Sequence, residues 1–518
     1  MKMNRIISYF MFIFVVIVLF LSLRGISGNP SKVNINSPMW TEKGPFEMSP
    51  ERGRFALTFS LIEDHSFNFD IPIARFVVPD LAISREKYVS LFAPLVSFIV
   101  MPGYIVGKYF NASQVGTFAI VSLFALFNFL LVRSISLRLG ANNIASALGA
   151  FVFLFASPAF VYAVTLYQHH LSTFLILMSI YILLRFKNAW SLFLTFFLCA
   201  LAIPLDYPNL FFLFPIGVFA LFRIFAGKYQ RNLLKVQISF IKFLTIFAMV
   251  LPILFFLWFN QMSYGDAFQI SGTLKTVKGI GDDGRPLSAE QLANLPGRRF
   301  EIKDLNRKKE LVKFFNTRSS LNGFYTHFAS PDRGIIYFTP VILLGILGLF
   351  LAYRKRVEMV PLFVAIIGAN VLLYSMWGDP WGGWAFGSRY LIPSYAILAI
   401  FISLLLTYWR KNILLLIIFL ILFSYSTAVN TLGAITSSAN PPQSEVLELE
   451  KLSGLVQKYT WERNWDFLVS GNSKSFVFQT YAKKYLNSVQ YYQILVWLII
   501  CSVLYLTALL WFFRKENE

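Results

Sequence analysis

The sequence predicts an all-α integral membrane protein with about twelve transmembrane helices and with both termini in the cytoplasm. Three observations predict this fold class. Hydrophobic residues make up 57% of the 518 residues and charged residues only 14%, whereas an average soluble protein has about 25% charged residues. Apolar residues form runs of about 18 or more, which is long enough to cross a bilayer. Basic residues, which bring the net charge to +20, gather beside alternate runs. This composition excludes a soluble enzyme, a disordered chain and a fibrous repeat.

The apolar runs predict the individual spans. They are 6–23, 115–132, 144–162, 169–184, 189–204, 208–222, 237–259, 335–353, 358–377, 391–408, 412–432 and 493–513. If the N-terminus lies inside, every inner turn carries at least two Lys or Arg residues, while the outer turns 163–168 and 205–207 carry none. The arrangement follows the positive-inside rule, so we expect it to set the orientation of the bundle.

One further apolar segment, 88–104, is not expected to span the membrane. Pro94 and Pro102 interrupt it, and proline breaks a helix because it lacks an N–H donor. If this segment did span, the basic cluster at 354–356 would face outward, against the charge rule. We therefore expect it to lie along the membrane surface.

The span assignment predicts how the chain is divided. Residues 1–432 would form a transmembrane bundle that carries a first outer loop at 24–114 and a second at 260–334. Residues 433–492 would form an outer loop or small cap, and 493–518 the last span and a cytoplasmic tail. Long loops are often functional. We therefore expect the chemistry on the extracytoplasmic face of the cell membrane.

The acidic residues and histidines support that expectation. Eight carboxylates lie in the first outer loop, and none occurs between Glu86 and Asp206. All four histidines also map to the outer side, whereas Lys242 is the single charged residue well inside a predicted span. Ion-coupled transporters usually place ionisable groups near the middle of the membrane. The distribution favours an enzyme that works at the membrane surface, with membrane lipid as a partner and no nucleic acid.

A candidate catalytic acid lies in the first outer loop. Apolar residues at 55, 57, 61 and 62 recur at helical spacing, which predicts an amphipathic helix on the membrane surface. Glu51 falls in its first turn, where the helix dipole favours a negative charge. Two interpretations follow from the spacing: Glu51 caps this helix and pairs with Arg54, or it is a catalytic carboxylate.

The segment SPERGRFALTFSLIEDHSF (49–67) resembles the first outer loop of GT-C type glycosyltransferases. This polyprenyl-phosphate-sugar-dependent class includes dolichyl-phosphate-mannose–protein mannosyltransferases and aminoarabinose transferases. The resemblance places Glu51 where the family has Asp, and Phe55 where it has Tyr. The continuation EKYVSLFAPLVSFIVMPGYIVGKYF (86–110) is similar to the family's interfacial segment, with Leu95 where Gly is usual.

Three later segments add to the resemblance. They are FNQMSYGDAF (259–268), FASPDRGIIYFTPVILL (328–344) and GDPWGGWAFGSRYLIPSY (378–395), the last similar to a Gly-x-Arg-Tyr-Leu-x-Pro motif. The resemblance implies a GT-C-like bundle that transfers a sugar from a polyprenyl-phosphate donor to an extracytoplasmic lipid, glycan or protein by direct displacement. A transporter or flippase of lipid-linked saccharides, and a glycan polymerase or ligase, remain alternatives.

Sugar transfer from a polyprenyl phosphate needs a base and a cation. For the base we expect Glu51, with Asp80 as the second candidate and Glu63 or Asp64 as the third. For the phosphate we expect Arg389 together with Tyr390, because a planar guanidinium can donate two hydrogen bonds to one phosphate. Arg54 is the second candidate cation. Alternatively, Arg389 only anchors its span at the membrane surface.

His169 and His170 lie in the predicted turn between the third and fourth spans. We expect them to contact the phosphate or another part of the substrate. They are also weak candidates for binding a divalent cation with an acid of the first loop, although adjacent residues of a helix do not share a face. A simple interfacial pair is the third alternative. The sequence leaves the metal requirement, the sugar, the acceptor and the oligomeric state open.

Overall fold

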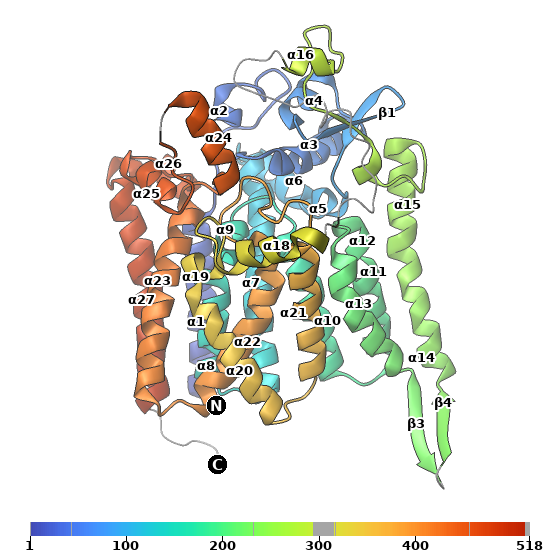
Figure 1. Ribbon diagram of the computed structural model, residues 1–518, viewed down its shortest axis with the longest axis vertical. Helices are drawn as coiled ribbons and strands as arrows, with labels where there is room; N and C mark the ends of the chain where they lie inside the picture. Colours follow the sequence, from blue (N-terminus) through green and yellow to red (C-terminus); the bar gives the residue numbers. More distant parts are fainter. Residues whose placement is uncertain are drawn as a thin grey trace.

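The computed structural model describes residues 2–42, 44–230, 233–293, 315, 317–454 and 456–512. Figure 1 shows a bundle of roughly parallel helices with long loops gathered at one end, called here the loop end. At the opposite end, α1 (Lys2–Ser22) begins and α27 (Ser488–Phe512) ends. The structure is mostly helical, as the sequence predicts.

The bundle is built from apolar helices. They are α1 (Lys2–Ser22), α7 (Ser113–Arg138), α8 (Asn143–Phe155), α10 (His169–Arg185), α11 (Ala189–Ala200), α13 (Asn209–Phe222), α14 (Phe240–Leu244), α15 (Val250–Tyr264), α20 (Leu343–Arg354), α21 (Val360–Ser375), α22 (Ile392–Tyr408), α23 (Ile413–Ile435) and α27 (Ser488–Phe512). Within the described residues, 5 helical segments are long and apolar enough to cross a membrane: Ser113–Arg138, Phe240–Tyr264, Arg389–Tyr408, Ile413–Ile435 and Ser488–Phe512. Shorter apolar helices occupy the other expected spans. Twelve spans, and their orientation, remain a prediction.

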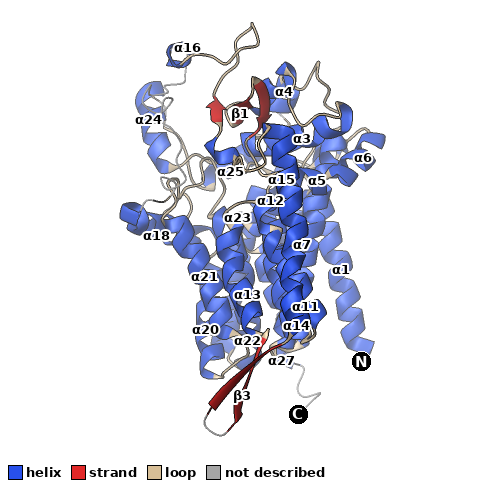
Figure 2. Ribbon diagram, turned by 90° about the vertical axis from the view of Figure 1, so that its right-hand side faces the viewer, coloured by secondary structure: helices blue, strands red, loops and turns tan. Residues whose placement is uncertain are grey.

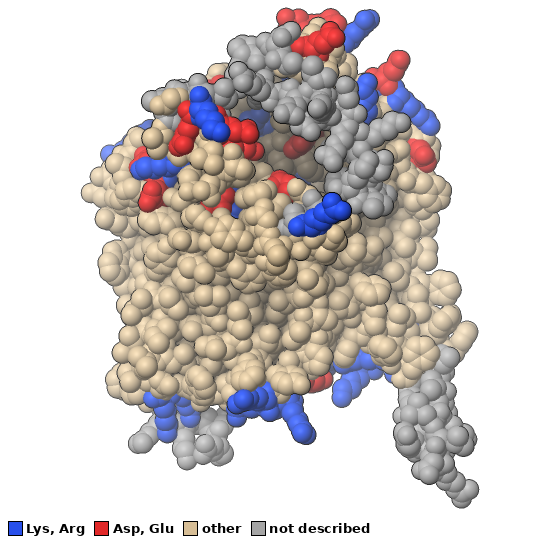
Figure 3. Space-filling view, viewed as in Figure 1, with Lys and Arg blue, Asp and Glu red and all other residues tan. Residues whose placement is uncertain are grey.

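Local sequence signals set the ends of several bundle helices. Helices α8, α11 and α23 begin after Asn142, Asn188 and Asn412, whose side chains accept hydrogen bonds from backbone N–H groups of the first turn. Such caps satisfy donors that have no partner within the helix. Arg138 and Arg354 lie in the last turns of α7 and α20. At the end opposite the loops, called here the basic end, Figure 3 shows mainly basic side chains, whereas the loop end carries most of the visible acidic side chains together with basic ones. This agrees with the charge pattern of the sequence.

Strands correct the all-α prediction. In the loop end, β1 (Leu81–Ser84) pairs antiparallel with both β2 (Lys87–Ser90) and β5 (Lys275–Val277). A second hairpin, β3 (Phe225–Gln230) with β4 (Leu233–Ile238), extends from the basic end (Figures 1 and 2). These segments lie outside the apolar helices, so their backbone groups pair with each other instead. The β1–β5 pairing joins the first and second outer loops into one layer.

The segment 88–104 does not form a membrane-length helix, as its prolines predict. It contains part of β2, the short helix α5 (Leu95–Ile99) and the beginning of the short helix α6 (Met101–Tyr109). Helix α6 lies directly against α7. A Cβ atom added to Gly116 would lie 1.9 Å from the carbonyl oxygen of Gly103, so only glycine allows the two backbones to approach this closely.

We expect Gly116→Ala to destabilise the protein by about 1–3 kcal/mol, because the added methyl group forces α6 away from α7. The matched control is Gly368→Ala in α21, where an added Cβ meets no atom within 4 Å. That change should leave stability within about 1 kcal/mol of the parent, on the stabilising side, because alanine favours helix. Thermal unfolding in detergent measures both variants. Equal unfolding temperatures would contradict the close α6–α7 packing.

Residues 433–492, called here the C-terminal cap, contain α24 (Gln443–Ser453), α25 (Glu462–Val469) and α26 (Phe476–Thr480). The backbone between α25 and α26 passes between the ends of two bundle helices. Lys474 N–H donates to the Ile435 carbonyl at 2.7 Å, and Phe476 N–H donates to the Leu23 carbonyl at 2.7 Å. Residues 474–476 are therefore docked against the ends of α1 and α23 and do not project as a free arm.

Candidate active site

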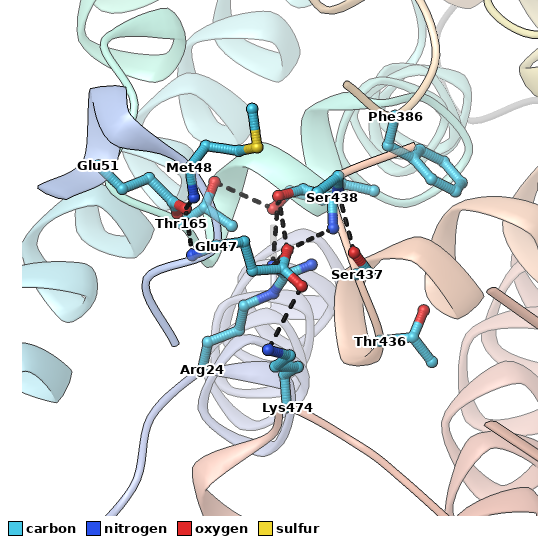
Figure 4. Close-up of polar contacts among 12 residues, drawn as sticks. Arg24, Glu47, Met48, Glu51, Thr165, Phe386, Thr436, Ser437, Ser438 and Lys474 are labelled. Atoms are coloured by element: carbon cyan, nitrogen blue, oxygen red, sulfur yellow. Dashed lines mark hydrogen bonds and ion pairs between the residues drawn. The ribbon is translucent and has the colours of Figure 1, made fainter. Parts of the chain in front are cut away.

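Glu51 lies in the first turn of α3 (Ser49–Glu63), as the sequence predicts. Its carboxylate accepts hydrogen bonds from the backbone N–H groups of Glu47 at 3.2 Å, Met48 at 3.3 Å and Leu166 at 3.4 Å. Figure 4 shows the first two of these contacts. Glu51 therefore caps its helix, as one of the two interpretations expects, but the expected pairing with Arg54 is not seen, since the Arg54 guanidinium donates to Gln168 instead. The expectation of an amphipathic surface helix is wrong, because most of α3 is buried beneath the other loops.

The surroundings of Glu51 and Glu47 separate the pKa values of these two carboxyl groups. Burial, together with the nearby charge of Glu47, raises the pKa of Glu51 to about 7. Burial also acts to raise the pKa of Glu47, but Lys474 and Arg24 outweigh it and lower that pKa to about 2. Two neighbouring carboxyls with well-separated pKa values are typical of acid–base sites. At neutral pH, Glu47 is therefore charged, whereas Glu51 is close to half protonated.

Arg54 lies one turn beyond Glu51 and is also buried. Its guanidinium donates to the side-chain oxygen of Gln168 at 2.6 Å and packs over the ring of Tyr167 at 5.6 Å. Gln168 in turn donates to Asp206 at 3.0 Å. Burial lowers the pKa of Arg54 to about 10, so it stays charged at neutral pH.

Asp206 is the site residue that the sequence reasoning missed. It follows the short helix α12 (Ala202–Leu205) and is partly exposed, whereas Glu51 is 0% exposed. Burial raises the pKa of Asp206, and the positive charge of Arg54 opposes this effect. The signal was present in the sequence, because Asp206 is the first acid after Glu86 and lies in a predicted outer turn.

Arg389 and Tyr390 lie just before α22 (Ile392–Tyr408), and Arg389 packs on the same tyrosine ring as Arg54. The Arg389 guanidinium carbon lies 4.9 Å from the ring centroid of Tyr167 and 5.5 Å from that of Tyr390. Tyr390 stacks on Tyr374 with the ring centroids 4.0 Å apart. His327 hydrogen-bonds to the hydroxyl of Ser388, the residue before Arg389. The structure thus brings together Arg389 and Arg54, which are distant in sequence, on the ring of one tyrosine.

His169 and His170 face different surroundings. His169 stacks on Tyr167, with 5.8 Å between ring centroids, and therefore belongs to the site. One ring nitrogen of His170 lies 2.7 Å from the Ala159 carbonyl and the other 3.3 Å from the Asn128 amide. Both nitrogens of His170 are therefore occupied within the bundle. This geometry does not favour a substrate or metal role for His170.

Asp80 lies outside this group of contacts. Its carboxylate accepts a hydrogen bond from the Ser49 hydroxyl at 2.6 Å and lies 4.0 Å from Lys278. Asp80 thereby joins the start of α3 to the second outer loop. Among the described residues, no group of three or more His, Cys, Asp and Glu side chains could hold a metal ion. The two histidines considered as metal candidates do not converge on one point.

Three buried nitrogen atoms of the site have no hydrogen-bond partner among the described residues. They are Nε of Arg54, Nε2 of His169 and Nε of Arg389. All three side chains pack against Tyr167. Buried polar groups are normally satisfied, and two guanidiniums favour a phosphate or carboxylate ligand. Figure 3 shows the surface hollowed at the loop end, with acidic atoms visible inside the hollow. The arrangement suits an anionic ligand next to a carboxyl group.

No protein-family model matches the chain, and no curated protein sequence matches it. Among solved structures, the chain is similar to an archaeal oligosaccharyltransferase, AglB from Archaeoglobus fulgidus, in complex with an inhibitory peptide and a dolichol-phosphate. The sequences are 13% identical and the TM-score is 0.36. The match covers 99% of this chain and 57% of that chain, so this chain spans little more than half the length of the archaeal protein.

Proposed function

We propose that the chain is a membrane glycosyltransferase that moves a sugar from a polyprenyl-phosphate donor to an acceptor hydroxyl on the extracytoplasmic side of the cell membrane. The observation that carries this proposal is the pair of guanidiniums, Arg54 and Arg389, on the ring of Tyr167. Each keeps a buried N–H without a partner among the described residues. The carboxyl groups of Glu51 and Asp206 supply the acid–base chemistry nearby.

The reaction would proceed by direct displacement. Glu51 takes the proton from the acceptor hydroxyl, and the acceptor oxygen forms a bond to the anomeric carbon of the sugar. The bond between that carbon and the phosphate oxygen breaks, and its electron pair leaves with the polyprenyl phosphate. Arg54 and Arg389 stabilise the negative charge that develops on the phosphate. The configuration at the anomeric carbon is inverted.

Two apolar grooves between α13 and α21 support a lipid-linked donor. A groove of about 560 Å³ at the loop-end half and one of about 660 Å³ at the other half share Phe214 and Pro215. The first reaches Leu373 and Met376, which flank Tyr374, the residue that stacks on Tyr390. An isoprenoid chain in these grooves would bring its phosphate end towards Tyr374 and Tyr390, and Tyr390 packs against Arg389.

Blocking this groove should weaken donor use. We expect Ala369→Trp, which adds bulk to the groove lining, to raise the KM for a long-chain donor by about tenfold through steric exclusion. Val364→Trp is the matched control, because Val364 lies on the same helix and is 47% exposed, away from the groove lining. Steady-state kinetics with long and short polyprenyl chains tests this. Equal KM values for the two variants would contradict the groove assignment.

Asp206 is a second candidate for the base, because it is partly exposed whereas the Glu51 carboxyl is enclosed. For Glu51 to reach an acceptor, the turn at 164–167 or the segment 44–48 must shift. Asp206→Asn and Glu51→Gln separate the two candidates. Loss of transfer in Glu51→Gln with most activity kept in Asp206→Asn supports Glu51, and the reverse result assigns the base to Asp206.

The test of the proposed function uses purified protein and a panel of polyprenyl-phosphate sugars. Release of free polyprenyl phosphate, detected by mass spectrometry, is the expected result. A transporter or flippase would move the lipid-linked sugar between leaflets of a vesicle without cleaving it. A polymerase or ligase would transfer a whole glycan rather than one sugar. Absence of free polyprenyl phosphate with every donor would contradict the proposed transfer.

A further inference from the structure

A buried charge cluster joins the C-terminal cap to the loop that carries Glu51. The Glu47 carboxylate lies 2.8 Å from Arg24 and 3.5 Å from Lys474, and Ser438 donates to it through both backbone N–H at 2.7 Å and hydroxyl at 2.9 Å. The side chains of Arg24, Glu47 and Lys474 are 0%, 7% and 8% exposed. Figure 4 shows these groups converging on Glu47 from separate elements. Two of its partners, Ser438 and Lys474, belong to the cap.

Backbone carbonyl groups accept further hydrogen bonds from the two cations of the cluster. Arg24 also donates to the carbonyl groups of Gly433 at 2.8 Å and Ala434 at 3.1 Å, at the end of α23. Lys474 donates to the Gly44 carbonyl at 2.8 Å. These contacts leave the cations little freedom to turn away from Glu47. The charge at this position is therefore fixed in space relative to α3.

Glu47 is the charged neighbour of Glu51. The Glu51 carboxylate accepts the hydrogen bond from the backbone N–H of Glu47, and the charge of Glu47 disfavours ionisation of Glu51. Further groups act on the two carboxyls electrostatically. The charged or titratable groups that face them are Arg24 after α1, Arg54 in α3, Tyr167 before α10, and Lys474 and Arg463 of the cap.

We infer that Glu47 and Lys474 are positioning residues: the C-terminal cap holds the Glu47 carboxylate charged beside Glu51 and thereby sets the proton affinity of Glu51. The inference rests on the proposed function in taking Glu51 as the base. It gives the cap a part in the reaction, although none of the cap residues that the structure describes is among the groups packed on Tyr167.

Two variants test this inference, because they should shift the pH at which Glu51 is protonated in opposite directions. Lys474→Met removes a positive charge and leaves Glu47 less neutralised, so protonation of Glu51 should shift to higher pH, by about one unit. The double variant Glu47→Gln with Lys474→Met removes the negative neighbour and keeps Arg24, so protonation should shift to lower pH by a similar amount. Lys474→Arg keeps the charge and should behave as the parent. Lys458→Met is the matched control, since Lys458 pairs with Asp466 at the exposed surface of the same cap.

The protonation of Glu51 is read from the infrared carboxyl band that disappears in Glu51→Gln, and in parallel from the acid side of the activity profile. The infrared band does not depend on activity. Opposite shifts in a protein that releases no polyprenyl phosphate would support the positioning role and reject the proposed transfer. The inference is wrong if the protonation of Glu51 shifts in the same direction in both variants. It is also wrong if the protein is active and neither variant shifts that protonation. If Lys474→Met does not fold, Lys474→Gln, which keeps a donor to Gly44, replaces it.

Discussion

Replacing Glu51 with Gln is expected to reduce the rate of sugar transfer by about 10²–10⁴-fold, the usual contribution of a general base. Glutamine keeps the size of the side chain but cannot accept the proton of the acceptor hydroxyl. The parent activity should also depend on pH. Because burial raises the pKa of Glu51 to about 7, the carboxyl is protonated and inactive below that pH. Activity should therefore rise as the pH increases through 7, and kcat/KM measured from about pH 5 to 9 checks this.

Glu63→Gln is the control for this experiment. Glu63 is the last residue of α3, and its partners are Lys108 at 2.7 Å and Tyr104 at 2.8 Å, away from Tyr167. The control should keep the activity and the pH profile of the parent. A Glu51→Gln protein that transfers sugar at the parent rate would show that Glu51 only caps α3.

Replacing Arg389 with Lys is expected to raise the KM for the donor by about 10–100-fold, with a smaller loss of kcat. Lysine keeps the charge but loses the planar fork that grips a phosphate through two hydrogen bonds. It also loses the stacking of a guanidinium on Tyr167 and Tyr390. Steady-state kinetics with donor varied at fixed acceptor measures both parameters.

Arg75→Lys is the matched control, because Arg75 lies 3.8 Å from the exposed Asp282 on the second outer loop. It should leave the donor KM unchanged. Normal donor binding in Arg389→Lys would return Arg389 to the simpler role of anchoring the start of α22.

The sequence predicts those parts of the fold that depend on residues close together in the chain. Apolar runs place the bundle helices, and Pro94 and Pro102 explain why 88–104 forms only short elements. The first turn of α3 was predictable because proline and an acid both favour that position. Arg54, His169 and Arg389 do meet on the ring of Tyr167, and Tyr390 packs against Arg389. Their role in the reaction remains a prediction.

Other features depend on contacts between distant parts of the chain, which periodicity and motifs do not reveal. The hydrogen bond from Arg24 to Gly433 joins residues 409 positions apart. The three-stranded sheet needs β5 of the second outer loop to pair with β1 of the first. Glu47 was counted in the sequence as one of eight loop acids. Its two cationic partners come from opposite ends of the chain, so no local pattern could distinguish Glu47 from its neighbours.

The docking of 473–476 between Leu23 and Ile435 has a consequence for biosynthesis. A membrane chain emerges from the ribosome N-terminus first, so Arg24 and Glu47 are made long before Ser438 and Lys474. Before residue 438 is translated, the neighbourhood of Glu51 lacks both partners, and until residue 474 is translated it still lacks Lys474. Chains that stop short of this segment therefore never acquire the finished environment of that carboxyl group, however well the preceding helices insert.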